Sequence, residues 1–195
     1  MAHVSPRTFY TVFATPIGDC AVAWNDIGIV AAWLPEASRG RLRSRIANRL
    51  PDASETVPDA AIAETIAAIT ALLHGVRVDL SRVRIDDARL AAFDRRVYDA
   101  ARTIPAGRVV SYAELAARVG ADATAREVGA ALGRNPFPII VPCHRIVAAA
   151  AGELGGFSAP GGTMTKRRLL TIEDARRDGA DDLFDAPSGA GIAAG

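Results

Sequence analysis

The segment NPFPIIVPCHRIV, residues 135–147, holds the side chains of this sequence that are best suited to chemistry. Cys143 lies between a proline and a histidine, and Arg145 follows directly. A cysteine reacts as its thiolate, and a neighbouring histidine or cation lowers the pKa of the thiol. Prolines that follow Asn135 and Phe137 favour a stiff, extended backbone. Cys143 is therefore either a preorganised nucleophile beside its own base or a small hydrophobic residue of the core.

A histidine next to the cysteine in sequence needs help to act as its base. Adjacent side chains rarely point the same way, so a link from His144 to the sulfur requires a turn or a bridging water. A third group must orient the imidazole, as in catalytic triads. Glu173, in the helical pattern KRRLLTIEDA, is the downstream candidate.

Zinc binding is the other common use of cysteine and histidine. Cys20, Cys143 and the three histidines show no CxxC or HxxxH spacing. Cys20, flanked by AVAW, has the setting of a buried hydrophobic residue. We therefore predict no metal and no cofactor.

Two short helices joined by a turn are predicted ahead of this segment. Residues 111–114 and 124–127 both fit the capping box, in which a hydroxyl and a glutamate satisfy each other's backbone donors. YAELAARV and AREVGAAL then form a helix-turn-helix layout. Such a pair is often only a packing unit. Arg126, however, lies in the first turn of the second helix, where a recognition helix meets a DNA groove, and Arg134 follows that helix.

The basic residues are of one kind. Of 23 basic residues only Lys166 is a lysine, although the net charge is only +1. Codon bias explains this composition, or else some arginines contact phosphates or base edges. No apolar run reaches the roughly eighteen residues of a membrane span, and the N-terminus lacks a signal-peptide pattern. With two distant cysteines, we expect a cytoplasmic protein with free thiols.

The patterns divide the chain into an α/β N-terminal part, residues 1–86, a mainly α part, 87–178, and a flexible tail, 179–195. The N-terminal part is expected to contain strands joined by tight turns, then two helices and one more strand. The segments are 8–34 for the strands, 38–50 and 59–75 for the helices, and 76–85 for the last strand. A helix over 90–104 opens the second part.

VPCHRIV resembles the active-site motif of the O6-alkylguanine-DNA alkyltransferases, also called methylated-DNA-protein-cysteine methyltransferases. IPAGRVVSYAELA, AREVGAALGRNPFPIIVPCHRIV and GGF…KRRLLTIE occur in the family's order and near its spacing, over roughly Phe93 to Ala175. Residues 15–33 resemble the family's N-terminal strands more loosely. The PCHR motif behind a helix-turn-helix is highly specific.

The resemblance implies a ribonuclease-H-like N-terminal domain and a winged-helix-like C-terminal domain with a helix-turn-helix. It implies DNA repair in which Cys143 attacks the alkyl group on O6 of guanine, or O4 of thymine, by in-line displacement. The thioether is stable, so each molecule acts once. The expected partner is alkylated double-stranded DNA, whose damaged base must leave the stack. We expect a monomer with no membrane partner.

Catalytic roles follow residue by residue from the resemblance. Cys143 falls on the alkyl acceptor, His144 on the water-linked base, and Glu173 on the acid that orients the histidine. Tyr112 falls on the tyrosine that donates a proton to the departing guanine and lies against the DNA backbone.

The resemblance also assigns DNA-binding and pocket residues. Arg126 falls on the arginine that fills the gap left by the flipped nucleotide, with Thr124 and Arg134 beside it in the DNA-binding set. Asn135 falls on the asparagine that braces the active-site turn, and Arg145 is expected to serve structure. Phe157 and Ser158 take the aromatic and small positions of the pocket loop, but FSAPGG makes that loop longer than the family's pattern.

Two further readings stay open. One is a non-catalytic binder that flags alkylated bases, which is disfavoured because relatives of that type replace the cysteine. The other is a DNA-binding regulator whose Cys143 senses alkylation, which is disfavoured because no regulatory domain is visible.

Overall fold

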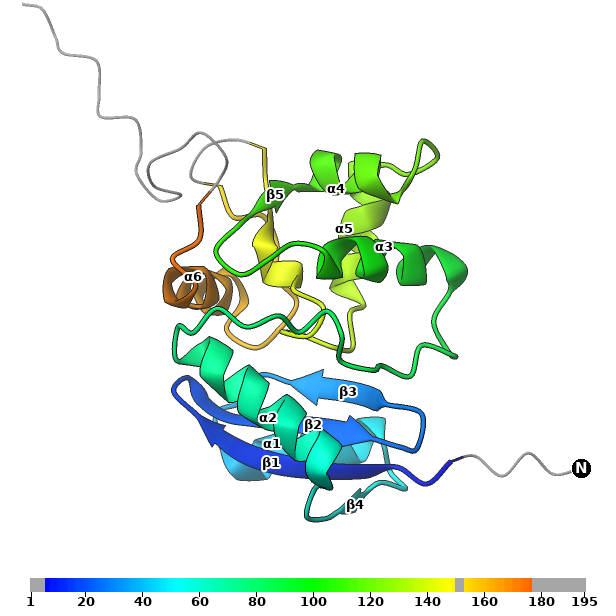
Figure 1. Ribbon diagram of the computed structural model, residues 1–195, viewed down its shortest axis with the longest axis vertical. Coiled ribbons are helices and arrows are strands. Elements are labelled where there is room, and N and C mark those ends of the chain that lie inside the picture. Colours follow the sequence, from blue (N-terminus) through cyan, green and yellow to red (C-terminus); the bar gives the residue numbers. More distant parts are fainter. Residues whose placement is uncertain (1–5, 150–152, 177–195) are drawn as a thin grey trace, which may run out of the picture.

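The computed structural model describes residues 6–149 and 153–176 of the 195-residue chain. A small sheet with one helix on each face forms one end of the molecule, and a group of helices forms the other (Figure 1). The predicted α/β character is confirmed. The proposed tail, 179–195, lies outside the described residues. Within the described part, no helix is long and apolar enough to cross a membrane.

The sheet has the strand order β3-β2-β1-β4. Its strands are β1 (Phe9–Thr15), β2 (Gly18–Trp24), β3 (Ile29–Trp33) and β4 (Ser54–Glu55). β1 and β2 pair antiparallel, as do β2 and β3, while β4 adds in parallel to β1. The two predicted tight turns, which join β1 to β2 and β2 to β3, are confirmed.

Alternation along β2 assigns each helix to one face of the sheet. Ala21 and Ala23 pack with Leu42 and Ile46 of α1 (Arg39–Arg49). Cys20, Val22 and Trp24 lie on the opposite face, in one core cluster with buried residues of α2 (Ala60–Leu73). Both helices begin with a side-chain cap, in which Ser38 accepts from the backbone N–H of Arg41 and Asp59 accepts from that of Ile62.

The prediction of a strand over 76–85 is wrong. Asp79 accepts a hydrogen bond from the backbone N–H of Ser81, at 2.8 Å, and turns the chain where the strand would run. Within 76–85 the one bridge to the sheet is the isolated pairing of Ile85 with Ile29. A Cβ at Gly28 would lie 2.7 Å from the carbonyl oxygen of Arg84, so this approach requires glycine.

The second half is mainly helical, as predicted. It contains α3 (Ala92–Arg102), α4 (Tyr112–Val119), α5 (Ala125–Gly133), a 3₁₀ turn η1 (Cys143–Arg145) and α6 (Gly162–Ile172). Strands β5 (Val110–Ser111) and β6 (Ile146–Val147) pair in parallel and hold η1 next to the start of α4. Both capping boxes are confirmed, Ser111 with Glu114 and Thr124 with Glu127.

One hydrophobic core continues from the sheet into the helices. It contains Val22 and Leu72 together with Val97, Leu132 and Cys143. Direct bonds also join the halves, since the backbone N–H of Ala32 donates to the carbonyl oxygen of Pro136 at 2.8 Å. The cysteine therefore lies where the sheet meets the helices, and the domain boundary at residue 86 stays a prediction.

Candidate active site

Asn135 fixes the loop that carries Cys143. Its side-chain amide donates to the carbonyl oxygen of Val141 at 3.0 Å, and its carbonyl oxygen accepts from the backbone N–H of Phe137 at 2.9 Å. Between them Ile139 holds a φ of 76°, which is costly for a β-branched residue. The loop is thus tied across its base, and the cysteine enters η1 with a restrained backbone.

Cys143 is a buried thiol, 8% exposed. Burial raises its pKa, while a hydrogen bond from Asn135 and the positive charge of Lys166 act in the opposite direction. Because the net shift is upward, the resting group at neutral pH is the thiol. Reaction as a thiolate therefore requires a base that takes the proton.

His144 and Glu173 form a buried pair, with 2.9 Å between Nε2 and Oε1. Burial alone would raise the pKa of Glu173, but His144 and Arg145 outweigh it and hold that pKa at about 2. Burial lowers the pKa of His144, so at neutral pH the imidazole is neutral and Arg145 is the permanent cation. The ionised carboxylate only accepts, so Nε2 carries the ring hydrogen. Nδ1 is left as a buried acceptor without a hydrogen bond to the described protein.

Arg145 supports this pair from the other side. Its Nε and Nη2 each donate at 2.9 Å, to Oε2 and Oε1 of Glu173, and its Nη1 donates to the carbonyl oxygen of Ile104 at 2.6 Å. The fork-like geometry fixes the carboxylate in two directions. These contacts support the structural role expected for Arg145.

Cys143 lines a cavity of about 430 Å³ between α5 and the loop before α6. Tyr112, Cys143, Phe157 and Ser158 line it together with Gly129, Leu132, Gly133 and Gly156. The Tyr112 hydroxyl donates to the carbonyl oxygen of Gly156 at 3.3 Å, and burial raises its pKa. Four of the predicted site residues thus meet around one space.

A glycine lets the Tyr112 ring reach that position. Gly155 has a φ of 68°, and a Cβ there would lie 2.9 Å from Cε2 of the tyrosine. Only glycine combines this backbone with so close a ring. That requirement explains the first part of the GGF sequence.

Lys166 is a site residue that the sequence pattern missed. It is fully buried, its Nζ donates to the carbonyl oxygens of Ile146 and Gly156, and it lies 5.6 Å from the centroid of the Tyr112 ring. Burial lowers its pKa to about 8. The lysine ties the strand after the cysteine to the pocket loop. The only feature of the sequence that could have drawn attention to Lys166 is that it is the one lysine.

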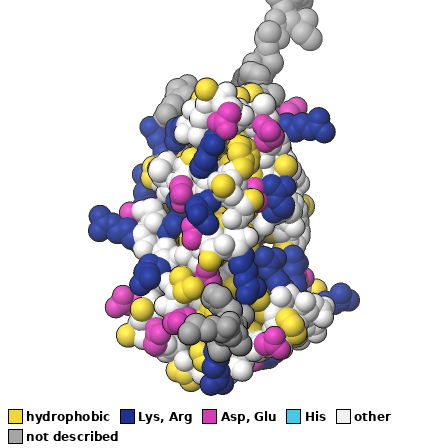
Figure 2. All heavy atoms as spheres, turned by 90° about the vertical axis from the view of Figure 1, so that its right-hand side faces the viewer, with side chains coloured by type: hydrophobic (Ala, Val, Ile, Leu, Met, Phe, Trp, Pro, Cys, Tyr) yellow, Lys and Arg dark blue, Asp and Glu magenta, His cyan; other side chains and the backbone are white. Residues whose placement is uncertain are grey.

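Of the predicted DNA-binding residues, Tyr112 lines this cavity, while Thr124, Arg126 and Arg134 are not among its lining residues. Thr124 and Arg126 are exposed at the start of α5. Arg134, at its other end, donates to both carboxylate oxygens of Asp94, at 3.1 and 2.7 Å. Figure 2 shows basic and acidic side chains interspersed on one face of the molecule, with basic ones gathered below its middle. No cluster of three or more potential metal ligands occurs in residues 6–149 and 153–176.

Acid is expected to destabilise the protein through Glu173. Its pKa of about 2 lies below the ordinary value of 4.5, so its contribution is complete above about pH 4.5 and is lost as the pH falls toward 2. The difference corresponds to about 3 kcal/mol. Urea denaturation at several pH values should show this loss in the native protein and a shallower pH dependence in Glu173→Gln. Parallel pH dependences would contradict the assignment.

The sequence of this chain is similar to a known protein family and to characterised members of it. Residues 92–175 match the model described as 6-O-methylguanine DNA methyltransferase, DNA binding domain. The methylated-DNA–protein-cysteine methyltransferase of Mycobacterium bovis is 47% identical over 93 residues, which are 48% of this chain and 54% of that protein. The aligned part therefore spans about half the length of this curated relative.

Solved structures extend the similarity to most of the chain. The crystal structure of Mycobacterium tuberculosis OGT in complex with DNA has a TM-score of 0.66 and 32% identity, and the match covers 85% of this chain and 92% of that one. The chain belongs to the O6-methylguanine-DNA methyltransferase family. The structure of Mycobacterium tuberculosis O6-methylguanine methyltransferase, at a TM-score of 0.67 and 29% identity, covers 93% of this chain and 96% of its own.

Membership of this family confirms the resemblance found in the sequence. The family match, residues 92–175, contains every predicted site residue from Tyr112 to Glu173. It begins at the first residue of α3, so the sheet and α1 lie outside it.

Proposed function

We propose that this protein repairs DNA directly, by moving an alkyl group from O6 of guanine, or O4 of thymine, to Sγ of Cys143. One observation carries the proposal. A buried thiol lies at the floor of a cavity of about 430 Å³, directly followed by a histidine whose orientation a buried carboxylate fixes. Such a cavity suits a single base turned out of its duplex.

The proposed reaction is an in-line displacement. A bridging water carries the thiol proton to Nδ1 of His144, and the Glu173 carboxylate stabilises the imidazolium that forms. The thiolate electron pair makes the S–C bond while the C–O6 bond breaks. The electrons of the C–O6 bond stay on the purine. Tyr112 donates a proton to the departing guanine, and the proton held by His144 returns through water to the Tyr112 oxygen. In the net change, alkyl and proton exchange places, and the stable thioether makes each molecule act once.

Alkylated double-stranded DNA is the proposed partner. The C-terminal part would act as a winged-helix-like domain whose helix-turn-helix is α4 and α5, and the sheet with its two helices as a ribonuclease-H-like domain. The solved relative from Mycobacterium tuberculosis contains DNA. Thr124, Arg126 and Tyr112 would lie against the duplex, and Arg134 would add charge while paired to Asp94. We propose that the protein acts as a cytoplasmic monomer.

Lesion counting tests the proposal. Increasing amounts of protein are incubated with a duplex that contains one O6-methylguanine, and the remaining lesions are counted. The lesions removed should rise linearly and stop at one per protein molecule. Tight binding with no lesion removed would favour a non-catalytic binder, and repeated turnover would contradict a stable thioether.

Arg126→Ala is expected to slow repair of duplex DNA by about tenfold or more. Unstacking a base costs a few kcal/mol, and a side chain inserted from the start of α5 offsets part of that cost. Free O6-alkylguanine has no stack to leave, so reaction with the free base is the control and should change little. An equal loss on both substrates, measured as single-turnover rates, would refute the intercalating role.

A further inference from the structure

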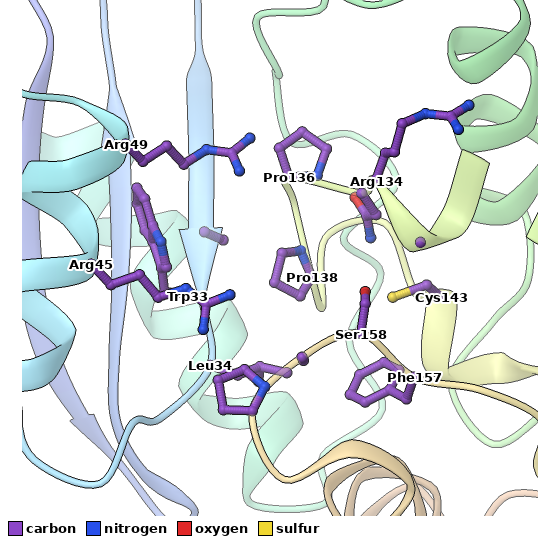
Figure 3. Close-up of a pocket in the computed structure, with 15 residues that line it drawn as sticks. Trp33, Leu34, Arg45, Arg49, Arg134, Pro136, Pro138, Cys143, Phe157 and Ser158 are labelled. Atoms are coloured by element: carbon purple, nitrogen blue, oxygen red, sulfur yellow. The ribbon is translucent and has the colours of Figure 1, made fainter. Parts of the chain in front are cut away.

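A second cavity of about 200 Å³ reaches the same sulfur from the side of the sheet (Figure 3). It shares Gly133, Cys143, Phe157 and Ser158 with the first cavity. Its other walls come from β3 and the residue after it, α1, the 134–138 segment and the two residues that lengthen the pocket loop. The proposed function uses the first cavity for the base and gives this one no role.

The walls change in character along the cavity. Near the sulfur, Figure 3 shows Pro138 and Phe157, which are apolar, with the Ser158 hydroxyl directed toward the thiol. Farther away, Arg45 and Arg49 extend from α1 toward the open space. No Asp or Glu is among the fifteen residues that line it.

The three arginines that line this cavity differ in whether a carboxylate pairs with them. Arg45 is paired with Glu36 and keeps a side chain that is 49% exposed. Arg134 is paired with Asp94. Arg49 makes no side-chain hydrogen bond or ion pair that the described residues show. A guanidinium whose charge is not neutralised, at the end of the cavity away from the thiol, is suited to bind a carboxylate through paired hydrogen bonds.

The longer pocket loop forms the remaining wall. Thr165 donates its hydroxyl to the carbonyl oxygen of Pro160 at 2.7 Å, and the backbone N–H of Gly162 donates to that of Ala159 at 3.0 Å. These bonds hold Ala159 and Pro160 against the cavity that faces α1. The insertion thus builds a defined wall.

We propose that this second cavity receives the distal end of the O6-alkyl group, and that Arg49, with Arg45, selects groups that end in a carboxylate. The inference rests on the proposed alkyl transfer. In an in-line displacement, the reacting carbon lies between the sulfur and O6, so its remaining substituent projects sideways. With the purine in the first cavity, the second is the space beside the sulfur. Methylene groups then meet Pro138 and Phe157, and an anionic end meets α1. A methyl group is too short to reach the arginines.

The test compares three duplexes, in which O6 of one guanine carries a methyl, a carboxypropyl or a carbamoylpropyl group. The last two have nearly the same shape and differ in charge. Single-turnover rates of S-alkylation at Cys143 are measured for each. The native protein should transfer carboxypropyl about tenfold faster than carbamoylpropyl, the scale of a hydrogen bond to a charged group. A ratio near one would overturn the proposal.

Variants of α1 identify the groups responsible. Arg49→Gln should bring the ratio toward one and Arg49→Lys should retain part of it, and the double variant Arg45→Gln, Arg49→Gln should remove it. Arg41→Gln, which changes the same charge on the same helix outside the cavity wall, should keep the native ratio. A ratio of carboxypropyl to carbamoylpropyl transfer that survives the double variant would overturn the proposal. Equal slowing of all three substrates by Arg49→Gln would also overturn it, because the arginine would then act on the DNA backbone. Absence of methyl transfer by the native protein would instead refute the proposed function itself.

Discussion

Cys143→Ser is expected to lower alkyl transfer by more than about a thousandfold, the scale on which loss of a nucleophile acts. A serine hydroxyl ionises far less readily than a thiol, and the neutral His144 is too weak a base to make up the difference. Serine is close to cysteine in size, so the cavity and α5 should keep their shape. Binding to methylated duplex, measured by electrophoretic mobility shift, should persist.

The second cysteine supplies a matched control. Cys20 is buried in β2, and burial raises its pKa to about 11. Its sulfur lies 3.7 Å from the hydroxyl of Thr15. Cys20 is not among the residues that line either of the cavities at Cys143. Cys20→Ser should therefore retain alkyl transfer. Transfer by the Cys143 variant at the rate of the Cys20 variant would assign the chemistry to another residue.

Glu173→Gln is expected to impair both stability and reaction. The substitution leaves the Arg145 guanidinium buried without its carboxylate, which typically costs about 3–5 kcal/mol and lowers Tm by roughly 10 °C. An amide can also donate to Nε2 of His144, which would move the ring hydrogen to Nδ1. The base would then lack its free lone pair, and we expect transfer to slow about a hundredfold or more.

Arg145→Met separates the two effects. It removes the same ion pair but leaves the contact of 2.9 Å between His144 and Glu173. Thermal unfolding should show a loss of stability comparable with that of Glu173→Gln. Single-turnover rates, measured well below both Tm values, should fall much less. A Glu173→Gln protein that is destabilised but reacts at the native rate would show that the carboxylate serves only the fold.

Local signals in the sequence predicted much of this structure. The two capping boxes, Ser111 with Glu114 and Thr124 with Glu127, marked the starts of α4 and α5 because their bonds lie within four residues. The sheet followed from short β-branched runs between tight turns. The strand over 76–85 was predicted wrongly, since the alternation was read without the turn that Asp79 makes.

Long-range packing could not be predicted in the same way. The contact between Glu173 and a histidine 29 residues away is an exception, because it was proposed from the sequence and the structure contains it. Arg45 and Arg49 line a cavity with Cys143 only because α1 packs near the junction of the sheet with the helices. Nothing in the sequence around either arginine marks that position. Lys166 is similar, because its burial depends on two backbone carbonyls that the fold brings to it.

The setting of Cys143 resolves the two readings of its segment. The thiol belongs to the hydrophobic core and also opens onto two cavities. The core fixes its position, and the adjacent His144 with Glu173 provides an oriented base. Core residue and proposed nucleophile are therefore compatible descriptions of one side chain.

The mass of the protein after reaction tests the central claim most directly. The protein is incubated with excess duplex containing O6-methylguanine, digested, and mapped by mass spectrometry. The peptide that contains Cys143 should be heavier by one methyl group, with an equal amount of guanine restored in the DNA. An unmodified Cys143 peptide beside intact lesions, or a methyl group on any other residue, would contradict the account.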